Sequence, residues 1–187
     1  MKIDRLISAL LLVVLAATAG MAVADDDNFY SWMLTIERKG EVAAVTDEVY
    51  KEECGSCHFA YQPGLLPAAS WRKLLAAKAL EDHFGENAEL DEDVRRPLLA
   101  LLEKHAADNS YYKRSRKIMA SLKGATPLRI TEVPYIRRKH DEIPARLIKP
   151  NAKVKSLSYC DACHQQADKG NYDDDTVSIP GHGDWTW

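Results

Sequence analysis

The sequence predicts a mainly α-helical protein. Apolar residues recur at helical spacing in several separate segments between residues 42 and 123. Strict alternation is confined to Trp32, Leu34 and Ile36, which hint at a short strand or extended arm. Four prolines interrupt residues 126–150, where little helical period remains, so we expect irregular, extended backbone there.

The first 24 residues are expected to be removed before the protein works. Lys2 and Arg5 precede an uncharged apolar run of 14 residues, Leu6 to Ala19, and Ala22-Val23-Ala24 follows it. That order is typical of a secretory signal peptide with its cleavage site. A membrane anchor is the alternative, but the run is shorter than the roughly 18 residues that a spanning helix needs. We therefore expect residues 1–24 to be a signal peptide and the mature chain to be periplasmic, without a transmembrane segment.

Helices are expected on both sides of the proline-rich segment. Ser70 is a suitable N-cap for a helix in which Trp71, Leu74, Leu75 and Ala79 form one apolar stripe. Pro97 is expected at the start of a later helix, because proline is tolerated only in the first turn. Gly85 and Gly124 are expected to end two of the helices, and the tail after Gly170 is expected to be loop. The predicted helices are 42–54, 71–82, 97–107, 113–123 and 157–167.

Charge is distributed unevenly along the mature chain. Residues 25–112 hold 9 Lys and Arg against 18 Asp and Glu, residues 113–155 hold 13 against 3, and residues 156–187 hold 1 against 6. The basic middle is either an ordinary solvated surface or a docking face for an acidic partner, with Lys113, Arg114, Arg116 and Lys117 clustered at one end. It could equally neutralise negative groups of a bound cofactor.

The four cysteines occur in two copies of one motif. Cys54-Gly55-Ser56-Cys57-His58 and Cys160-Asp161-Ala162-Cys163-His164 both read C-x-x-C-H, the signature of covalent c-type haem attachment. Two thiols on one helical turn can add to the two vinyl groups of one haem, and the next residue then places its imidazole under the iron. The sequence therefore predicts two haem c groups, with His58 and His164 as proximal ligands.

A zinc site is the rival interpretation, because two C-x-x-C pairs can form a Cys₄ cage. It leaves both trailing histidines without a role and closes a loop of about a hundred residues. Two haems also suit a short, proline-interrupted chain, since each would form part of its core. We expect the haem-free chain to be poorly folded, especially after residue 125.

Each iron has a second axial position, for which several side chains are available. His83 follows the first motif by 25 residues, and His140 precedes the second by 24. His105 is expected to be a hydrogen-bonded core residue, His182 to be exposed in the tail, and Met119 to serve packing. The other available residue is Met33.

The runs around these motifs resemble the bacterial diheme cytochrome c (DHC-type) family over about residues 48–181. The resemblance rests on Leu65-Leu66-Pro67-Ala68-Ala69-Ser70-Trp71, His83-Phe84-Gly85, Arg129-Ile130-Thr131, His140, the run from Cys160 to Tyr172, and Val177-Ser178-Ile179-Pro180.

The resemblance implies a class I cytochrome c-like N-terminal haem domain, residues 25–125, and a smaller, irregular C-terminal haem-binding domain, residues 126–187. It implies low-potential, low-spin haems with bis-histidine ligation, so that His58, His83, His140 and His164 are the iron ligands. Spacing favours His83 for the first haem and His140 for the second, although a crossed arrangement stays open. The implied partners are redox proteins, either the small oxygen-binding sphaeroides haem protein or a membrane cytochrome b, and no nucleic acid.

Three function classes follow from this reading. An electron carrier is favoured, because six-coordinate irons leave no open position for a substrate and no other catalytic pattern is present. A haem enzyme of peroxidase or reductase type with one open iron is the first alternative. A subunit of a larger respiratory complex is the second.

Overall fold

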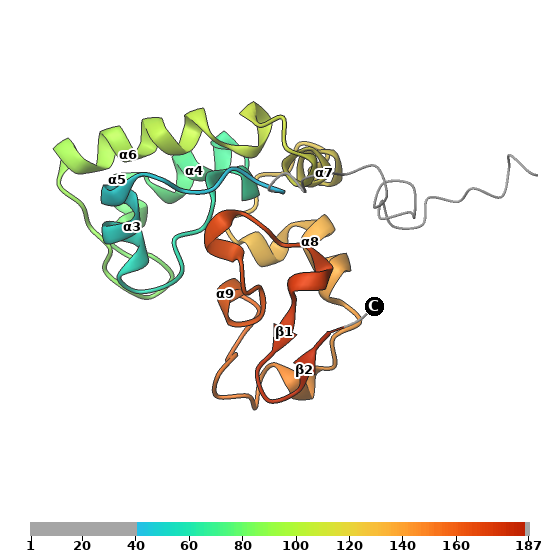
Figure 1. Cartoon of the computed structure of the whole chain (residues 1–187). Coiled ribbons are helices and arrows are strands. Elements are labelled where there is room, and N and C mark those ends of the chain that lie inside the picture. The colour runs from blue at the N-terminus through green and yellow to red at the C-terminus, as the bar shows by residue number, and fades with distance from the viewer. Residues whose placement is uncertain (1–40, 186–187) are drawn as a thin grey trace, which may run out of the picture. The chain divides into compact units, whose positions relative to one another are not determined.

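The computed structural model describes residues 41–185 of the 187-residue chain (Figure 1). The predicted signal peptide, Met33 and the alternating residues 32, 34 and 36 lie outside the described residues. Those that are described belong to one compact unit. The boundary between residues 125 and 126 stays a prediction. Within residues 41–185, no helix is both long and apolar enough to cross a bilayer.

The structure is mainly helical, as the sequence predicts. Its first part contains α3 (Glu48–Gly55), η1 (Pro63–Leu65), α4 (Ala68–Leu74), α5 (Ala77–Leu80), α6 (Glu92–Lys104), η2 (Ala107–Asn109) and α7 (Lys113–Leu122). Its second part contains η3 (Ile130–Glu132), α8 (Pro134–His140), η4 (Ala145–Leu147), α9 (Cys160–Cys163), η5 (Ala167–Lys169), η6 (Asp174–Thr176), β1 (Ser178–Ile179) and β2 (Gly183–Asp184). Figure 1 shows α3 to α6 gathered together, and α8, α9 and the two strands gathered together.

Helix α3, which leads into the first motif, begins later than predicted. Asp47 is its N-cap, and the Asp47 carboxylate accepts a hydrogen bond of 2.8 Å from the backbone N–H of Tyr50. Since a capping side chain satisfies one of the free donors of the first turn, Asp47 fixes the start at Glu48. The predicted helical residues 42–47 are therefore extended or irregular.

The predicted helix 71–82 is two helices, α4 and α5, and Ser70 does not cap either. Pro67 precedes α4, and Ser70 is a buried residue inside that helix. The free N–H of Ala68 donates instead to the carboxylate of Asp108 at 2.9 Å. This cap comes from 40 residues further along the chain, so a local pattern could not predict it.

Helix α6 overturns the expectation for Pro97, which lies in its second turn. The helix begins at Glu92, ahead of the predicted start at Pro97, with Glu92 and Asp93 in its first turn. Acidic residues there are favoured by the positive end of the helix dipole. Because proline has no N–H, the backbone carbonyl of Asp93, four residues earlier, has no donor at Pro97. Pro97 and Asp93 are both exposed, so this carbonyl lies on the solvent side of the helix.

The proline-rich segment is more helical than predicted, because Pro134 starts a helix rather than breaking one. Pro134 is the first residue of α8, where its missing N–H costs nothing.

Helix α7 matches its prediction closely and ends with Lys123 at a φ of 48° before Gly124. The helix of the second motif is shorter than predicted, and the expected loop tail contains an antiparallel hairpin that pairs Ser178 with Asp184 and Ile179 with Gly183.

The core joins distant parts of the sequence. Helix α4 packs against α6, and α7 packs against α8. The larger apolar cluster contains Leu65, Leu102 and Ile118 from the first part, together with Val133 and Tyr172 from the second. A smaller cluster around the second motif contains Ile148, Val154 and Ile179.

Gly170 connects the two ends of the described chain. Its carbonyl accepts hydrogen bonds from the N–H groups of Glu41 and Val42 at 3.0 and 3.1 Å. A Cβ atom at this position would collide with the carbonyl of Val42, and the φ of Gly170 is 71°. Only glycine avoids both the collision and the steric cost of that left-handed conformation.

Candidate haem-binding sites

The first motif lies at the end of α3. Cys54 is half-buried against the larger core cluster, whereas Cys57 is exposed. His58 donates from its Nδ1 to the backbone carbonyl of Phe59, 2.8 Å away. Because that hydrogen bond places the ring proton on Nδ1, the Nε2 atom of His58 keeps its lone pair for a metal.

His83 faces His58. The centroids of the two imidazole rings are 6.4 Å apart, and the ring planes differ by 20°. Metal–imidazole bonds of about 2 Å on both sides of one ion, added to the sizes of the two rings, require a centroid separation of about 6 Å. The two histidines are therefore spaced as a pair of axial ligands would be.

A tight turn presents His83 to the first site. The backbone of His83 exchanges hydrogen bonds with Glu86, at 2.7 and 3.3 Å. Phe84 and Gly85 have φ angles of 58° and 103°, and the Asp82 carboxylate accepts from the N–H of Gly85 at 2.9 Å. Partial burial lowers the pKa of His83, with smaller contributions from the nearby His58 and Arg129. The neutral ring that a metal needs is thus favoured.

The second motif forms α9 and its exit. His164 follows the last residue of the helix, and its N–H donates to the Cys160 carbonyl at 2.8 Å. His140 is the last residue of α8, and its Nδ1 donates to the carbonyl of Ile136 at 2.8 Å. The Nε2 atom of His140 therefore keeps its lone pair, as that of His58 does.

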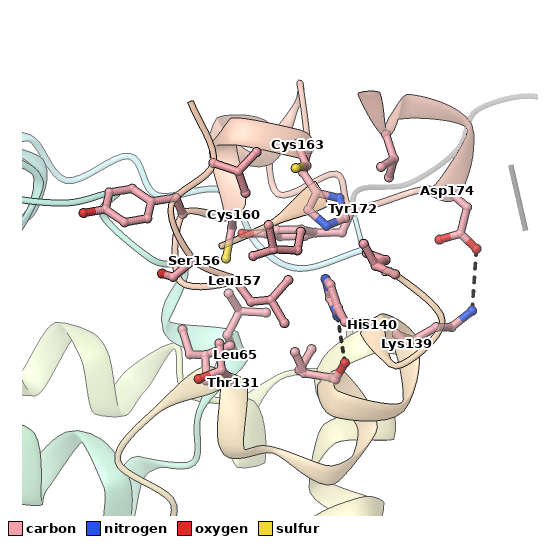
Figure 2. Close-up of a pocket in the computed structure, with 18 of the residues that line it drawn as sticks. Leu65, Thr131, Lys139, His140, Ser156, Leu157, Cys160, Cys163, Tyr172 and Asp174 are labelled. Atoms are coloured by element: carbon pink, nitrogen blue, oxygen red, sulfur yellow. Dashed lines mark hydrogen bonds and ion pairs between the residues drawn. The ribbon is translucent and has the colours of Figure 1, made fainter. Parts of the chain in front are cut away.

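His140 and His164 form a second facing pair. Their ring centroids are 6.0 Å apart, and their planes are crossed at 69°. Each distal candidate thus lies opposite the proximal histidine that spacing assigns to it, and the crossed pairing is not observed. Figure 2 shows His140 rising from α8 toward the second motif, with Cys160 and Cys163 on the opposite wall.

A pocket lies between these two histidines. The space between its walls, including open solvent at its mouth, is about 820 Å³. Cys160, Cys163, His140 and His164 all line it. The remaining wall is mostly aliphatic, from Leu65, Ile130, Ile136, Ile143, Ile148, Val154, Leu157 and Val177. An apolar wall with two thiols and two facing imidazoles suits a haem, which is a large apolar ring bound through two thioethers and two axial ligands.

Burial dominates the electrostatics of the second site. It lowers the pKa of His164 to about 3, with smaller effects from His140 and Arg114. It also raises the pKa of the Cys160 thiol to about 12 and, at the first site, that of the Cys54 thiol to about 11. The Nδ1 atom of His164 is buried without a hydrogen-bond partner, unlike the Nδ1 atoms of His58 and His140.

Three of the remaining ligand candidates, His105, His182 and Met119, lie within the described residues. His105 is exposed at the end of α6, so the prediction that it is a core residue is wrong. His182 is exposed, as predicted. Met119 packs against the larger core cluster, in agreement with a packing role.

Side chains between the two sites were not predicted from the sequence. Tyr61 stacks on His58 with a centroid separation of 5.0 Å and donates to the carbonyl of Ser158 at 2.5 Å. Tyr172 lies 5.1 Å from His164, ring to ring, and its hydroxyl donates to the side chain of Gln62. These bonds span 97 and 110 residues, so local spacing carries no signal for them.

The zinc interpretation does not agree with the geometry. In the part of the chain that the structure describes, no three His, Cys, Asp or Glu side chains gather as a metal site. Both cysteine pairs lie in this part, so they do not share a cage. The arrangement instead suits two sites of the c-type haem class, each with a C-x-x-C thiol pair and a pair of facing imidazoles.

Comparisons with known proteins agree with this class. The family model of dihaem cytochrome c matches residues 50–172. A diheme cytochrome c structure from Shewanella baltica is 44% identical with a TM-score of 0.61, over 74% of this chain and 96% of that one. A diheme cytochrome c structure from Rhodobacter sphaeroides is 41% identical with a TM-score of 0.61, over 70% of this chain and 100% of that one. No curated protein matched the chain.

The chain therefore belongs to the dihaem cytochrome c family. Membership implies two haem groups and haem-based electron transfer. This confirms the resemblance that the sequence suggested.

Proposed function

We propose that this protein is a periplasmic electron carrier with two covalently attached, bis-histidine haem c groups. Cys54 and Cys57 would hold the first haem, and Cys160 and Cys163 the second. His58 and His83 would be the axial ligands of the first iron, and His140 and His164 those of the second. The observation that carries this proposal is the facing of the two histidine pairs, at 6.4 and 6.0 Å.

Each haem, when bound, supplies a one-electron couple whose potential depends on its axial ligands, their hydrogen bonds and burial. In the folded protein, hydrogen bonds from the chain hold the ligands in place. The Phe59 and Ile136 carbonyls fix the rings of His58 and His140 with Nε2 available. Two imidazoles at each site leave no axial position for a substrate, which favours electron transfer over catalysis at iron.

The aliphatic wall of the pocket at the second site would also keep water away from the haem. Ile136, Ile143, Ile148 and Val154 surround the space between His140 and His164 and limit the entry of water. Few water molecules would need to reorient when a haem in this pocket gains or loses an electron. The reorganisation energy of electron transfer would therefore be small. The proposed location follows from the signal peptide 1–24, and the proposed partners are a small haem protein of the sphaeroides type or a membrane cytochrome b.

The proposal is tested on the holoprotein, purified after export with its haem attached. The expected result is two haems per chain that resist acid-acetone extraction and are reduced and reoxidised reversibly. The absorption spectra should be low-spin in both states and unchanged by carbon monoxide or cyanide.

A high-spin band together with rapid ligand binding would contradict the carrier and favour the haem enzyme. Recovery of all the protein in a detergent-stable membrane assembly would favour the respiratory-complex subunit. A haem content of one per chain would contradict the assignment of one of the two motifs.

A further inference from the structure

Helices α7 and α8 carry cations and no carboxylate. Their sequences are KRSRKIMASL and PYIRRKH. Lys113, Arg116, Arg137 and Arg138 are exposed. The surrounding residues 113–155 hold 13 Lys and Arg against 3 Asp and Glu, in a chain whose net charge is only −3. Positive charge is therefore concentrated on these two helices.

Cations of the two helices come together at the ring of Tyr135. The ring of Tyr135, in α8, is approached by Lys117 of α7 with its Nζ at 5.9 Å and by Arg138 of α8 with its Cζ at 5.7 Å. The backbone N–H of Tyr135 also donates to the hydroxyl of Ser121 in α7 at 3.2 Å. We call the exposed residues Lys113, Arg116, Arg137 and Arg138, with Lys117, the basic face.

The basic face ends at the second candidate haem site. Helix α8 continues from Arg137 and Arg138 directly to His140, whose ring faces His164. Lys139, between them, lines the pocket and pairs with Asp174 at 3.5 Å. A molecule on the basic face is therefore within one helical turn of the distal ligand.

Arg114 does not belong to this surface, although its neighbours in the sequence do. It is only 8% exposed, and its Nε donates to the Glu41 carboxylate at 2.8 Å. One of its terminal nitrogens also donates to the carbonyl of Tyr172 at 3.1 Å. The grouping of Arg114 with docking cations is thus wrong, because Arg114 is buried against acceptors of the chain itself.

We propose that the basic face of α7 and α8 is the docking surface for an acidic face of a protein redox partner, which exchanges one electron with the second site beside His140. The inference rests on the proposed function. In each exchange the protein loses one electron and the oxidised partner gains it. Opposite charges would steer the partner to this end of the molecule and raise the association rate, more strongly at low salt.

The test uses the fully loaded holoprotein, with both haems chemically reduced and the excess reductant removed, and oxidised acidic plastocyanin, a copper protein, as the electron-accepting probe. The face variant is Arg116→Gln, Arg137→Gln, Arg138→Gln. The control variant is Arg146→Gln, Lys149→Gln, Lys153→Gln, which removes the same charge from exposed positions of the same basic segment. Stopped-flow mixing gives the second-order rate at ionic strengths from about 10 mM to about 0.5 M, across which the Debye length shrinks from roughly 30 Å to a few Å.

The face variant should react about tenfold more slowly than the native protein at low salt and lose most of its salt dependence, because steering is the part of the rate that charge supplies. The control variant should react nearly as fast as the native protein. Both reduction potentials and both haem spectra should be the same in all three proteins, which separates a docking defect from a failure of the haem sites.

Three results would overturn the inference. An unchanged rate in the face variant would show that the face does not dock the probe. An equal loss in both variants would show an effect of net charge alone. Binding of the native protein to phosphatidylglycerol vesicles that the face variant loses, with no change in rate, would assign the face to a lipid surface. Absent haem or high-spin spectra in the native protein would instead refute the proposed function.

Discussion

His140 and His164 face each other with their ring planes crossed at 69°, whereas His58 and His83 lie within 20° of parallel. The difference follows from how each ring is held. His140 is fixed along α8 by its bond to Ile136, and His164 leaves α9 next to the ring of Tyr172. The two candidate sites therefore differ in the orientation of their imidazoles, which would give each bound haem a separate spectroscopic signature.

The first prediction concerns the distal ligands. His83→Met and His140→Met should each alter one haem and leave the other unchanged, because each ring faces a different proximal histidine. Thioether ligation favours the ferrous state, so the potential of the altered haem should rise. A spectroelectrochemical titration measures both potentials. If either variant titrates like the native protein, that histidine is not a ligand.

The second prediction concerns the thiols of the haem-free chain. In the closed fold, burial raises the pKa of Cys160 to about 12 and that of Cys54 to about 11. Burial disfavours the thiolate, which is the reactive form of cysteine. If the haem-free chain kept the described fold, alkylation of these two thiols would be slow at any pH below their raised pKa values. We expect the haem-free chain to be open instead. Its iodoacetamide reactivity should rise around the ordinary thiol pKa of about 8.5 and should match that measured in urea. Reactivity that appears only above about pH 11 would show that the pockets close without haem.

The third prediction concerns the ion pair between the buried Arg114 and the partly exposed Glu41. Glu41→Gln keeps the shape of the side chain but removes the negative charge beside the buried Arg114 guanidinium. Breaking a fully buried pair by removing one partner costs about 3–5 kcal/mol, so this part-buried pair should cost less than that and still lower the Tm of the holoprotein in thermal unfolding. The matched control is Glu92→Gln, whose pairs with Arg95 and Arg96 are on the surface. Similar Tm values for the two variants would contradict the structural role of the part-buried pair.

The fourth prediction concerns Tyr61, which connects the two motifs. Tyr61→Phe keeps the ring beside His58 but removes the donor to the carbonyl of Ser158. Leaving a partly buried acceptor unsatisfied should cost about 1–3 kcal/mol in urea unfolding. Tyr111→Phe is the control, because Tyr111 is 80% exposed. Equal midpoints for the two variants would argue against a connecting role.

The sequence was sufficient where the signal is local. The two C-x-x-C-H motifs, the basic helix that ends before Gly124 and the exposure of His182 all depend on neighbouring residues. It failed where a distant residue decides. Asp108 rather than Ser70 caps α4. Arg114 pairs with Glu41, which lies 73 residues away in the sequence. The prediction at Pro134 was wrong for another reason. Proline can either end a helix or begin one, and the residues after Pro134 form a helix.

The placement of His83 and His140 shows the same division. Spacing indicated which motif each would serve, but spacing alone left a crossed arrangement open. The turn at Phe84 and Gly85 brings His83 to face His58, and the length of α8 brings His140 to face His164. The sequence pattern predicted neither the turn nor this helix. The histidine pairs are thus a product of tertiary structure, although every member was visible in the sequence.

The proposed function requires two haems, each held between two histidines, one pair near-parallel and the other crossed. Electron paramagnetic resonance of the fully oxidised holoprotein tests it most directly, because the anisotropy of a low-spin ferric signal depends on the angle between the axial ligand planes. We expect two low-spin signals of equal intensity, one ordinary rhombic signal from the near-parallel site and one of much larger anisotropy from the crossed site. A high-spin signal from either haem, or two identical low-spin signals, would contradict it.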